Sequence, residues 1–329
     1  MEQITVAKKT YSRIGASLLV MGLVAMLISY LISFLLNTLE GRGYDVEASW
    51  IMWVVTFVPL YGIGIPVGLL ILRKLPREEH SSQKLSGKNF FIFMLMCFPL
   101  MYGGNIIGNI LSMILSGGNA QNPLNEIAFD TNFLKVVVMV ILGPLFEEWV
   151  FRREIIDRCS RFGEKAAILF SALAFGLFHM NLYQFFYAFG LGLVFGYVYT
   201  RTRKLIYPYI MHVVINFIGG VVAPWILSTL DLEELAQMGM KPMDEAAMME
   251  MMEMMPQLML FMLYGFLLLG LAIAGLVLLI IKAKKLVFVT AAEELPKEEG
   301  FKCVYCNAGV VLLVVYCLVM CVVSLISSI

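Results

Sequence analysis

The segment FLKVVVMVILGPLFEEWVFRR, residues 133–153, is the most informative about the fold because a long apolar run leads directly into Glu147, Glu148, Arg152 and Arg153. Charged side chains at membrane depth are costly unless they face the interior of a helical bundle or a water-filled cavity. The segment therefore predicts a membrane-embedded helix whose charged face is turned towards other helices of the same protein.

The composition of the whole chain agrees with a membrane protein. Of the 329 residues, 60% are hydrophobic and only 15% are charged, and the mean hydropathy is +0.84. A helix needs about 20 apolar residues to cross the hydrocarbon core of a bilayer. We therefore predict an all-α, polytopic transmembrane helical bundle with nine spans, at residues 14–36, 50–72, 90–115, 133–151, 166–179, 182–199, 205–230, 258–281 and 310–329.

The charged residues between these spans predict the orientation of the chain. Basic segments alternate with segments that carry almost no Lys or Arg, and the basic ones are 1–13, 73–88, 152–165, 201–204 and 282–302. Lys and Arg accumulate in the short loops on the cytoplasmic side. We expect the N-terminus to lie inside, in a multi-pass protein of the cell membrane that contacts the lipid bilayer and has no nucleic-acid partner.

The chain divides into four parts by the same pattern. Residues 1–132 hold N-terminal spans, 133–230 hold a catalytic core, 231–257 form an external loop, and 258–329 hold C-terminal spans. The loop carries nine methionines between Met238 and Met255. Thioether sulfur suits Cu(I), but no Cys or His accompanies these residues, so we expect an amphipathic helix at the outer interface with Met as apolar filling.

Pairs of glycines predict where helices approach one another closely. Gly104 and Gly108 are four residues apart, as are Gly192 and Gly196. This spacing places both glycines of a pair on one helix face, where neighbouring backbones can come close.

Three pairs of residues within the predicted core have the spacing i to i+4, and each pair includes at least one polar side chain. The pairs are Glu148 with Arg152, Phe175 with His179, and His212 with Asn216. On a helix, such residues share a face one turn apart. Arg152 can neutralise Glu148, whereas Glu147 points about 100° further round the helix and remains available for chemistry.

Glu147, His179, His212 and Asn216 form a set that is suited to amide hydrolysis. A buried carboxylate can act as a general base on water, and histidine can orient that water. The oxyanion that forms needs donors placed in advance, which a histidine ring and the Asn216 amide can supply. No Ser or Cys is paired with a base, so a covalent nucleophile is not expected.

The predicted spans set a geometrical condition on this site. They place Glu147 near the inner face of the membrane and His179 near the outer face. The two residues can meet only if the fourth helix continues inward to about Cys159 and the fifth extends past His179.

These residues resemble the three motifs of the CPBP or Abi family of intramembrane proteases, which includes the type II CAAX prenyl endopeptidases and bacteriocin-processing and self-immunity proteins. The motif EExxxR corresponds to Glu147, Glu148 and Arg152, FxxxH to Phe175 and His179, and HxxxN to His212 and Asn216. All three motifs occur in order within predicted spans.

The resemblance implies an all-helical CPBP-type glutamic endopeptidase of eight spans, to which the ninth span is an added C-terminal helix. It implies that Glu147 activates water with help from His179, that His212 and Asn216 form the oxyanion hole, and that Glu148, Arg152 and Phe175 support these four residues. No cofactor is expected. Zn²⁺ is the alternative, because two His and one Glu are a common catalytic zinc set, although the HExxH motif is absent.

The substrate implied is a peptide or protein at the membrane. A prenylated CAAX tail, a leader peptide and another membrane protein are all compatible with an intramembrane pocket. The resemblance also suggests a bacterial plasma membrane, which would make a prenylated substrate less expected.

Three other interpretations remain open from the sequence. The polar residues could only hold helices together, since polar side chains stabilise helix contacts in membranes. The chain could be a transporter, although it lacks the two related halves with broken helices that many transporters have. It could also be a non-catalytic membrane partner or immunity protein, against which the complete set Glu147, His179, His212 and Asn216 argues.

Overall fold

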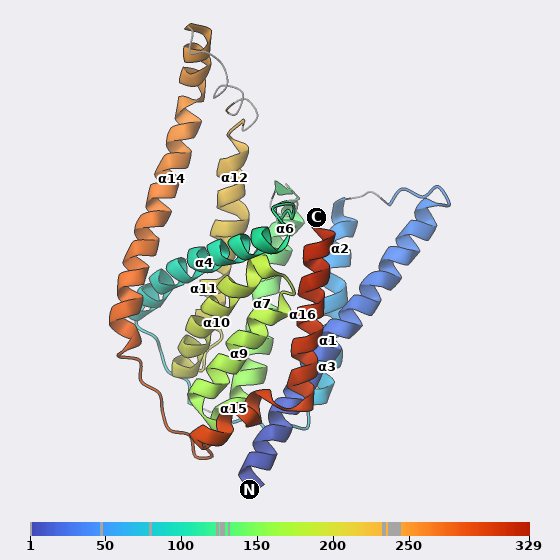
Figure 1. Cartoon of the computed structure of the whole chain (residues 1–329), viewed down its shortest axis with the longest axis vertical. Coiled ribbons are helices and arrows are strands. Elements are labelled where there is room, and N and C mark those ends of the chain that lie inside the picture. Colours follow the sequence, from blue (N-terminus) through green and yellow to red (C-terminus); the bar gives the residue numbers. More distant parts are fainter. Residues whose placement is uncertain are drawn as a thin grey trace.

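The computed structural model describes residues 2–46, 49–78, 81–122, 125, 129–130, 132–231, 235 and 245–329. The described residues form helices and contain no strand, which confirms the predicted all-α polytopic bundle (Figure 1). The helices before the motif region are α1 (Glu2–Glu40), α2 (Ser49–Phe57), the π-helical η1 (Val58–Gly64), α3 (Ile65–Leu72) and α4 (Gly87–Leu115).

The motif region begins with one helical segment that changes its winding several times. Its parts are α6 (Phe133–Lys135), π-helical η2 (Val136–Leu142), α7 (Gly143–Glu148), π-helical η3 (Trp149–Ile156), α8 (Asp157–Cys159) and the 3₁₀ turn η4 (Ser160–Phe162). The helices that follow are α9 (Glu164–Phe178), α10 (Leu182–Thr202), α11 (Ile206–Phe217), π-helical η5 (Ile218–Val222), α12 (Ala223–Ser228), α14 (Glu245–Ala283), α15 (Lys297–Tyr305) and α16 (Ala308–Ser327).

Each of the nine predicted spans corresponds to a helical segment, and seven of them are long and apolar enough to cross a membrane in the described part of the chain. The other two are the segment 133–159, which carries the charged motif, and the 15-residue helix α9. These two helices hold Glu147 and Phe175. The first is too charged, and the second too short, to count as a long apolar span.

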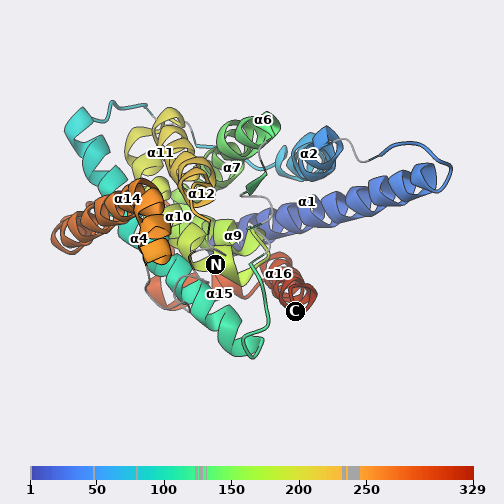
Figure 2. The same ribbon diagram turned by 90° about the horizontal axis from the view of Figure 1, so that it is seen from above.

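Helices α9 and α10 lie in the middle of the bundle, with α1 and α16 on one side and α4 and α14 on the other (Figure 2). The predicted glycine contacts are confirmed here. A Cβ atom on Gly104 would lie 2.4 Å from the backbone nitrogen of Tyr187, and one on Gly192 would lie 2.9 Å from the Cα atom of Ala172. Small residues therefore bring α4 and α9 into backbone contact with α10.

The C-terminal helix α16 packs against α1 in the same way. A Cβ atom on Gly15 would lie 2.5 Å from the carbonyl carbon of Gly309, and the Gly309 N–H donates to the Ser12 hydroxyl at 3.1 Å. Tyr11, Leu18 and Val310 are buried along these helices. The predicted added helix is thus a tightly packed part of the bundle.

Basic loops gather at the end of the bundle where the N-terminus lies (Figure 1). Their charges are paired with acidic residues: Arg161 with Glu293 at 2.7 Å, Arg201 with Glu164, and Arg203 with Asp157 at 3.1 Å. A buried ion pair at this end joins Arg158 to Glu154 at 2.7 Å. This end matches the one that the sequence predicts to be cytoplasmic.

The Met-rich segment 231–257 lies partly outside the described residues, including the methionines from Met238 to Met243. From Glu245 onwards it is the first part of α14, a helix of 39 residues that continues into the next span. At about 1.5 Å per residue, such a helix is longer than the hydrocarbon core is thick. Met248 to Met255 therefore extend a spanning helix, whereas the sequence suggested a separate helix lying on the interface.

Candidate functional site

The geometrical condition set by the sequence is half met. The helix that carries Glu147 continues from Phe133 to Cys159, as required. Helix α9, however, ends at Phe178 with His179 as its C-cap, so the expected extension past His179 is wrong. Met180 adopts a left-handed conformation with φ of 54°, and the Asn181 side chain caps the next helix by accepting from the Gln184 N–H at 2.8 Å. A tight turn therefore holds His179 in place.

A break in the backbone ladder explains the position of Asn216. The Gly143 N–H bonds to the Val138 carbonyl five residues earlier, as in a π-helix. The next amide in that ladder would belong to Pro144, which has no N–H, so the Met139 carbonyl has no backbone donor in this register. The Asn216 side-chain amide donates to the Met139 carbonyl instead, at 2.9 Å. Asn216 is thereby fixed against the helix that carries Glu147.

Glu148 and Arg152 form the predicted ion pair in the protein interior. The Arg152 Nε donates to one Glu148 carboxylate oxygen at 2.8 Å, and the two side chains, of Arg152 and Glu148, are 0% and 1% exposed. A further guanidinium N–H donates to the Ser171 hydroxyl at 3.0 Å, and Ser171 in turn donates to the Phe151 carbonyl at 2.5 Å. A buried charge needs several hydrogen-bond partners. Because Ser171 is one of them, the ion pair links the helix that carries Glu147 to α9.

Phe175 lies at the centre of the predicted residues. The Arg152 guanidinium is 4.9 Å from the centre of its ring, a distance typical of a cation–π contact. The rings of His179 and His212 meet it edge to face, with centroid distances of 4.9 and 5.7 Å. The aromatic residue of the FxxxH motif therefore supports both histidines from one side.

Glu147 points away from this ion pair and is 20% exposed, against 1% for Glu148. One of its carboxylate oxygens accepts a hydrogen bond from the Tyr61 hydroxyl at 2.7 Å. The other oxygen lies 3.6 Å from the Nε2 atom of His212, which is longer than a hydrogen bond. The imidazole of His212 thus stands between two carboxylates, because its Nδ1 is 3.0 Å from Glu148.

The partners of the two rings indicate how their nitrogens can act. Nδ1 of His179 is 2.9 Å from the Phe175 carbonyl, which only accepts, so this nitrogen carries the hydrogen and the neutral ring presents Nε2 as an acceptor. Nδ1 of His212 faces the Glu148 carboxylate and is likewise the donor. Nε2 of His212 can therefore donate only when the ring carries both protons.

These residues surround a cavity of about 360 Å³. Its polar lining includes Glu147, His179, Gln184, His212 and Asn216, and its apolar lining comes from α1, α2, η1, α3, η2, η3, α9 and α10. Glu148 and Arg152 are not in the lining. All four residues predicted to be catalytic therefore face one cavity, and the ion pair supports them from behind.

No three His, Cys, Asp or Glu side chains in the described part of the chain converge as ligands for a metal ion. In His179 and His212, Nδ1 has a protein partner, so these two residues turn Nε2 towards the cavity, as Glu147 does its carboxylate. The four described cysteines in or near the C-terminal helices are free thiols far along the chain from the motifs.

Tyr61 and Ser171 bond to residues of the motifs but belong to none of the three motifs. Tyr61 lies in η1, 86 residues before Glu147, and its ring stacks on Phe57 at 4.8 Å. Gly143 leaves room for it, since a Cβ atom there would lie 3.3 Å from the Tyr61 hydroxyl. Ser171 is the other residue, and its position four residues before Phe175 on α9 is the only signal that could have indicated it.

Comparison with known proteins relates the sequence of the motif region to membrane peptidases. Residues 129–218 match the family model described as type II CAAX prenyl endopeptidase Rce1-like. The chain is also 26% identical over 189 residues to the Bacillus subtilis (strain 168) protein named "Putative membrane peptidase YdiL", covering 55% of this chain and 71% of that protein. No solved structure gives a significant match.

The matched segment contains all three motifs and the residues that line the cavity from α7 to α11. The match over residues 129–218 and the similarity to a membrane peptidase support the resemblance to the CPBP family that the sequence motifs predicted.

Proposed function

We propose that this chain is an intramembrane endopeptidase that hydrolyses peptide bonds with a water molecule activated by Glu147. The observation that carries the proposal is the convergence of Glu147, His179, His212 and Asn216 on one cavity at the centre of a membrane-spanning bundle. Glu147 alone of the two adjacent glutamates faces this cavity. The Rce1-like family match supports a protease.

Water attack requires a base that is held in position but not neutralised by a permanent cation. The Tyr61 hydroxyl binds one oxygen of Glu147 and leaves the other towards the cavity. A carboxylate in this position can take a proton from water as the water oxygen attacks the peptide carbonyl, and can give that proton to the amine that leaves when the C–N bond breaks. His179, with Nε2 available as an acceptor, would orient the same water.

The attacked carbonyl oxygen becomes an oxyanion, which we propose is stabilised by His212 and Asn216. Asn216 uses one amide N–H on the Met139 carbonyl and has a second N–H to donate. His212 can donate through Nε2 when its ring carries both protons, and the carboxylates of Glu147 and Glu148 lie on either side of that ring. Donors placed in advance in this way act without reorganisation during the reaction.

The proposed substrate is a peptide or protein that enters the cavity from the membrane or its surface. A volume of about 360 Å³ admits a short stretch of extended peptide rather than a folded domain. We place the protein in the plasma membrane of a bacterium, as its Bacillus subtilis relative suggests.

The proposal is tested with purified protein in detergent and a panel of quenched-fluorescent peptides. Wild type is compared with Glu147→Ala and His212→Ala, each with and without a metal chelator. Loss of cleavage in both variants, with no effect of the chelator on wild type, supports a glutamate-activated water. Loss of wild-type cleavage on chelation would replace it by a zinc site, and equal cleavage by all three proteins would reject catalysis at this cavity.

A further inference from the structure

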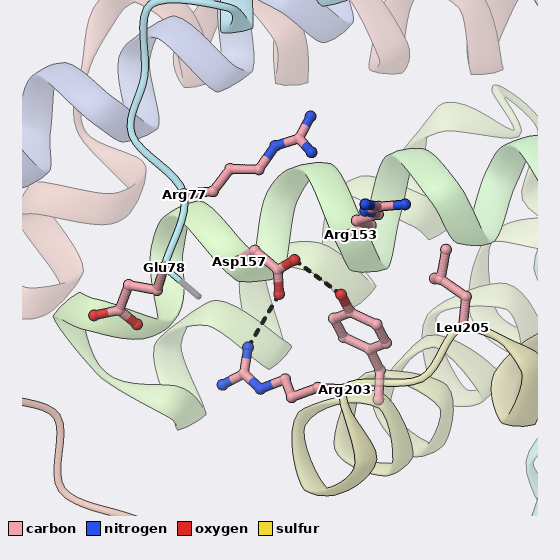
Figure 3. Close-up of a pocket in the computed structure, with 7 residues that line it drawn as sticks. Arg77, Glu78, Arg153, Asp157, Arg203 and Leu205 are labelled. Carbon is pink, nitrogen blue, oxygen red and sulfur yellow. Dashed lines mark hydrogen bonds and ion pairs between the residues drawn. The ribbon is translucent and has the colours of Figure 1, made fainter. Parts of the chain in front are cut away.

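A second and larger cavity, of about 630 Å³, lies outside the site described above. Its lining comes from three separate parts of the chain: Arg77 and Glu78 from the loop after α3, Arg153 and Asp157 from η3 and α8, and Tyr199, Arg203 and Leu205 from the end of α10 and the turn after it (Figure 3). None of these residues lines the cavity that contains Glu147.

The position of this cavity relative to the spans is defined by the chain itself. Arg203 directly follows the candidate span that ends at Thr202, and Leu205 directly precedes the one that begins at Ile206. Arg77 comes five residues after the span that ends at Leu72. The cavity therefore opens where several spans end, at the depth of lipid headgroups.

Most polar groups in the lining already have a partner in the protein. Asp157 accepts from the Tyr199 hydroxyl at 2.9 Å and from Arg203 at 3.1 Å (Figure 3). Arg77 is paired with Glu154, a carboxylate that it shares with Arg158. Tyr199 and Arg203 thus both donate to the Asp157 carboxylate. The Glu154 carboxylate binds the guanidinium groups of both Arg77 and Arg158.

Arg153 differs from the other arginines of the lining. It is exposed, and within the described ranges no hydrogen bond or ion pair of its side chain is found. Among the described lining residues, three arginines face two carboxylates, so these residues carry one positive charge in excess. A ligand with a single negative charge and several acceptor oxygens would neutralise that excess and bind the remaining N–H donors.

We propose that this cavity binds the phosphodiester of an anionic lipid headgroup, with Arg153 and Arg203 as the main ligands. A phosphodiester carries the single negative charge that the lining requires, and basic pockets between spanning helices at the membrane surface are suited to such headgroups. Arg153 lies directly after Arg152 in the chain. The lipid would therefore contact the same helix that carries Glu147. The contact would lie towards the end of that helix, away from the Glu147 carboxylate.

The test measures lipid binding to the full chain and needs no protease activity. The apparent Kd is determined by native mass spectrometry in detergent for phosphatidylglycerol, for phosphatidylcholine with the same acyl chains, and for glycerophosphoglycerol, the soluble headgroup. The variants are Arg153→Gln, Arg203→Gln and, as a control with the same charge change, Lys88→Gln, an exposed residue at the start of α4 outside this cavity.

Wild type should prefer phosphatidylglycerol to phosphatidylcholine, and each arginine variant should bind phosphatidylglycerol about tenfold more weakly, as expected for loss of one charge-assisted contact. The Lys88 variant should keep wild-type affinity. Equal weakening in all three variants, or no preference between the lipids, would overturn the proposal. Binding of the soluble headgroup as tightly as the lipid would reject the lipid and leave a soluble phosphodiester. Since Arg203 also binds Asp157, the exposed Arg153 decides the result if the Arg203 variant does not fold.

Discussion

Replacing Arg152 with Met should destabilise the bundle strongly, because it leaves a buried carboxylate without its cation. The substitution removes two hydrogen bonds to Glu148 and one to Ser171, and among the described residues only His212 remains as a partner of Glu148. Removing one member of a buried ion pair typically costs about 3–5 kcal/mol. The free energy of unfolding of Arg152→Met should fall by that amount, as measured by loss of helical signal with denaturant in detergent.

The double variant Glu148→Gln/Arg152→Met separates charge from packing. The amide oxygen that replaces the Glu148 carboxylate could still accept from His212, and no unpaired charge would remain. The double variant should therefore be more stable than Arg152→Met alone, with a coupling energy of about 0.5–3 kcal/mol between the two positions. Arg161→Met serves as a control, because Arg161 is in a partly exposed pair with Glu293 and should cost no more than about 1 kcal/mol. A double variant that is no more stable than the single one would refute the role given to this pair.

Three further predictions concern the cavity and its support. Tyr61→Phe should lower kcat about tenfold while leaving the unfolding temperature close to wild type, since it removes one hydrogen bond to Glu147 and no packing; an unchanged kcat would show that Tyr61 does not position the carboxylate. Asn216→Ala should lower kcat by roughly 10²–10³ with little change in KM if it removes an oxyanion donor, whereas a change in KM alone would assign it to substrate binding. Gly104→Ala should lower the unfolding temperature because its Cβ would meet the backbone of α10, while Gly103→Ala, which faces open space, should not; equal effects would contradict the close contact.

The sequence predicted the fold class and the close contacts for physical reasons that remain visible in the structure. Apolar segments of sufficient length became helices, and glycines four residues apart became contact points between α4, α10 and α9. Pairs with i to i+4 spacing are geometrically determined by the helix, so the contact of Glu148 with Arg152 could be predicted without any tertiary information.

Contacts between distant segments could not be predicted in this way. Tyr61 lies in an apolar span without a motif, and its bond to Glu147 depends on how η1 packs against α7. The bond of Asn216 to Met139 arises from a combination of π-helical winding and Pro144 that no residue spacing indicates. The end of α9 at Phe178 depends on the left-handed turn at Met180, a residue type that rarely adopts this conformation.

The most direct test of the proposed mechanism is the rate of peptide cleavage by Glu147→Gln in proteoliposomes. This change keeps the shape of the side chain and removes its ability to take a proton, and Glu253→Gln, on the exposed face of α14, is the matched control. The mechanism predicts a loss of at least about 100-fold for Glu147→Gln with an unchanged unfolding temperature, and a wild-type rate for the control. A folded Glu147→Gln protein that cleaves at the wild-type rate would contradict the claim that Glu147 activates the attacking water.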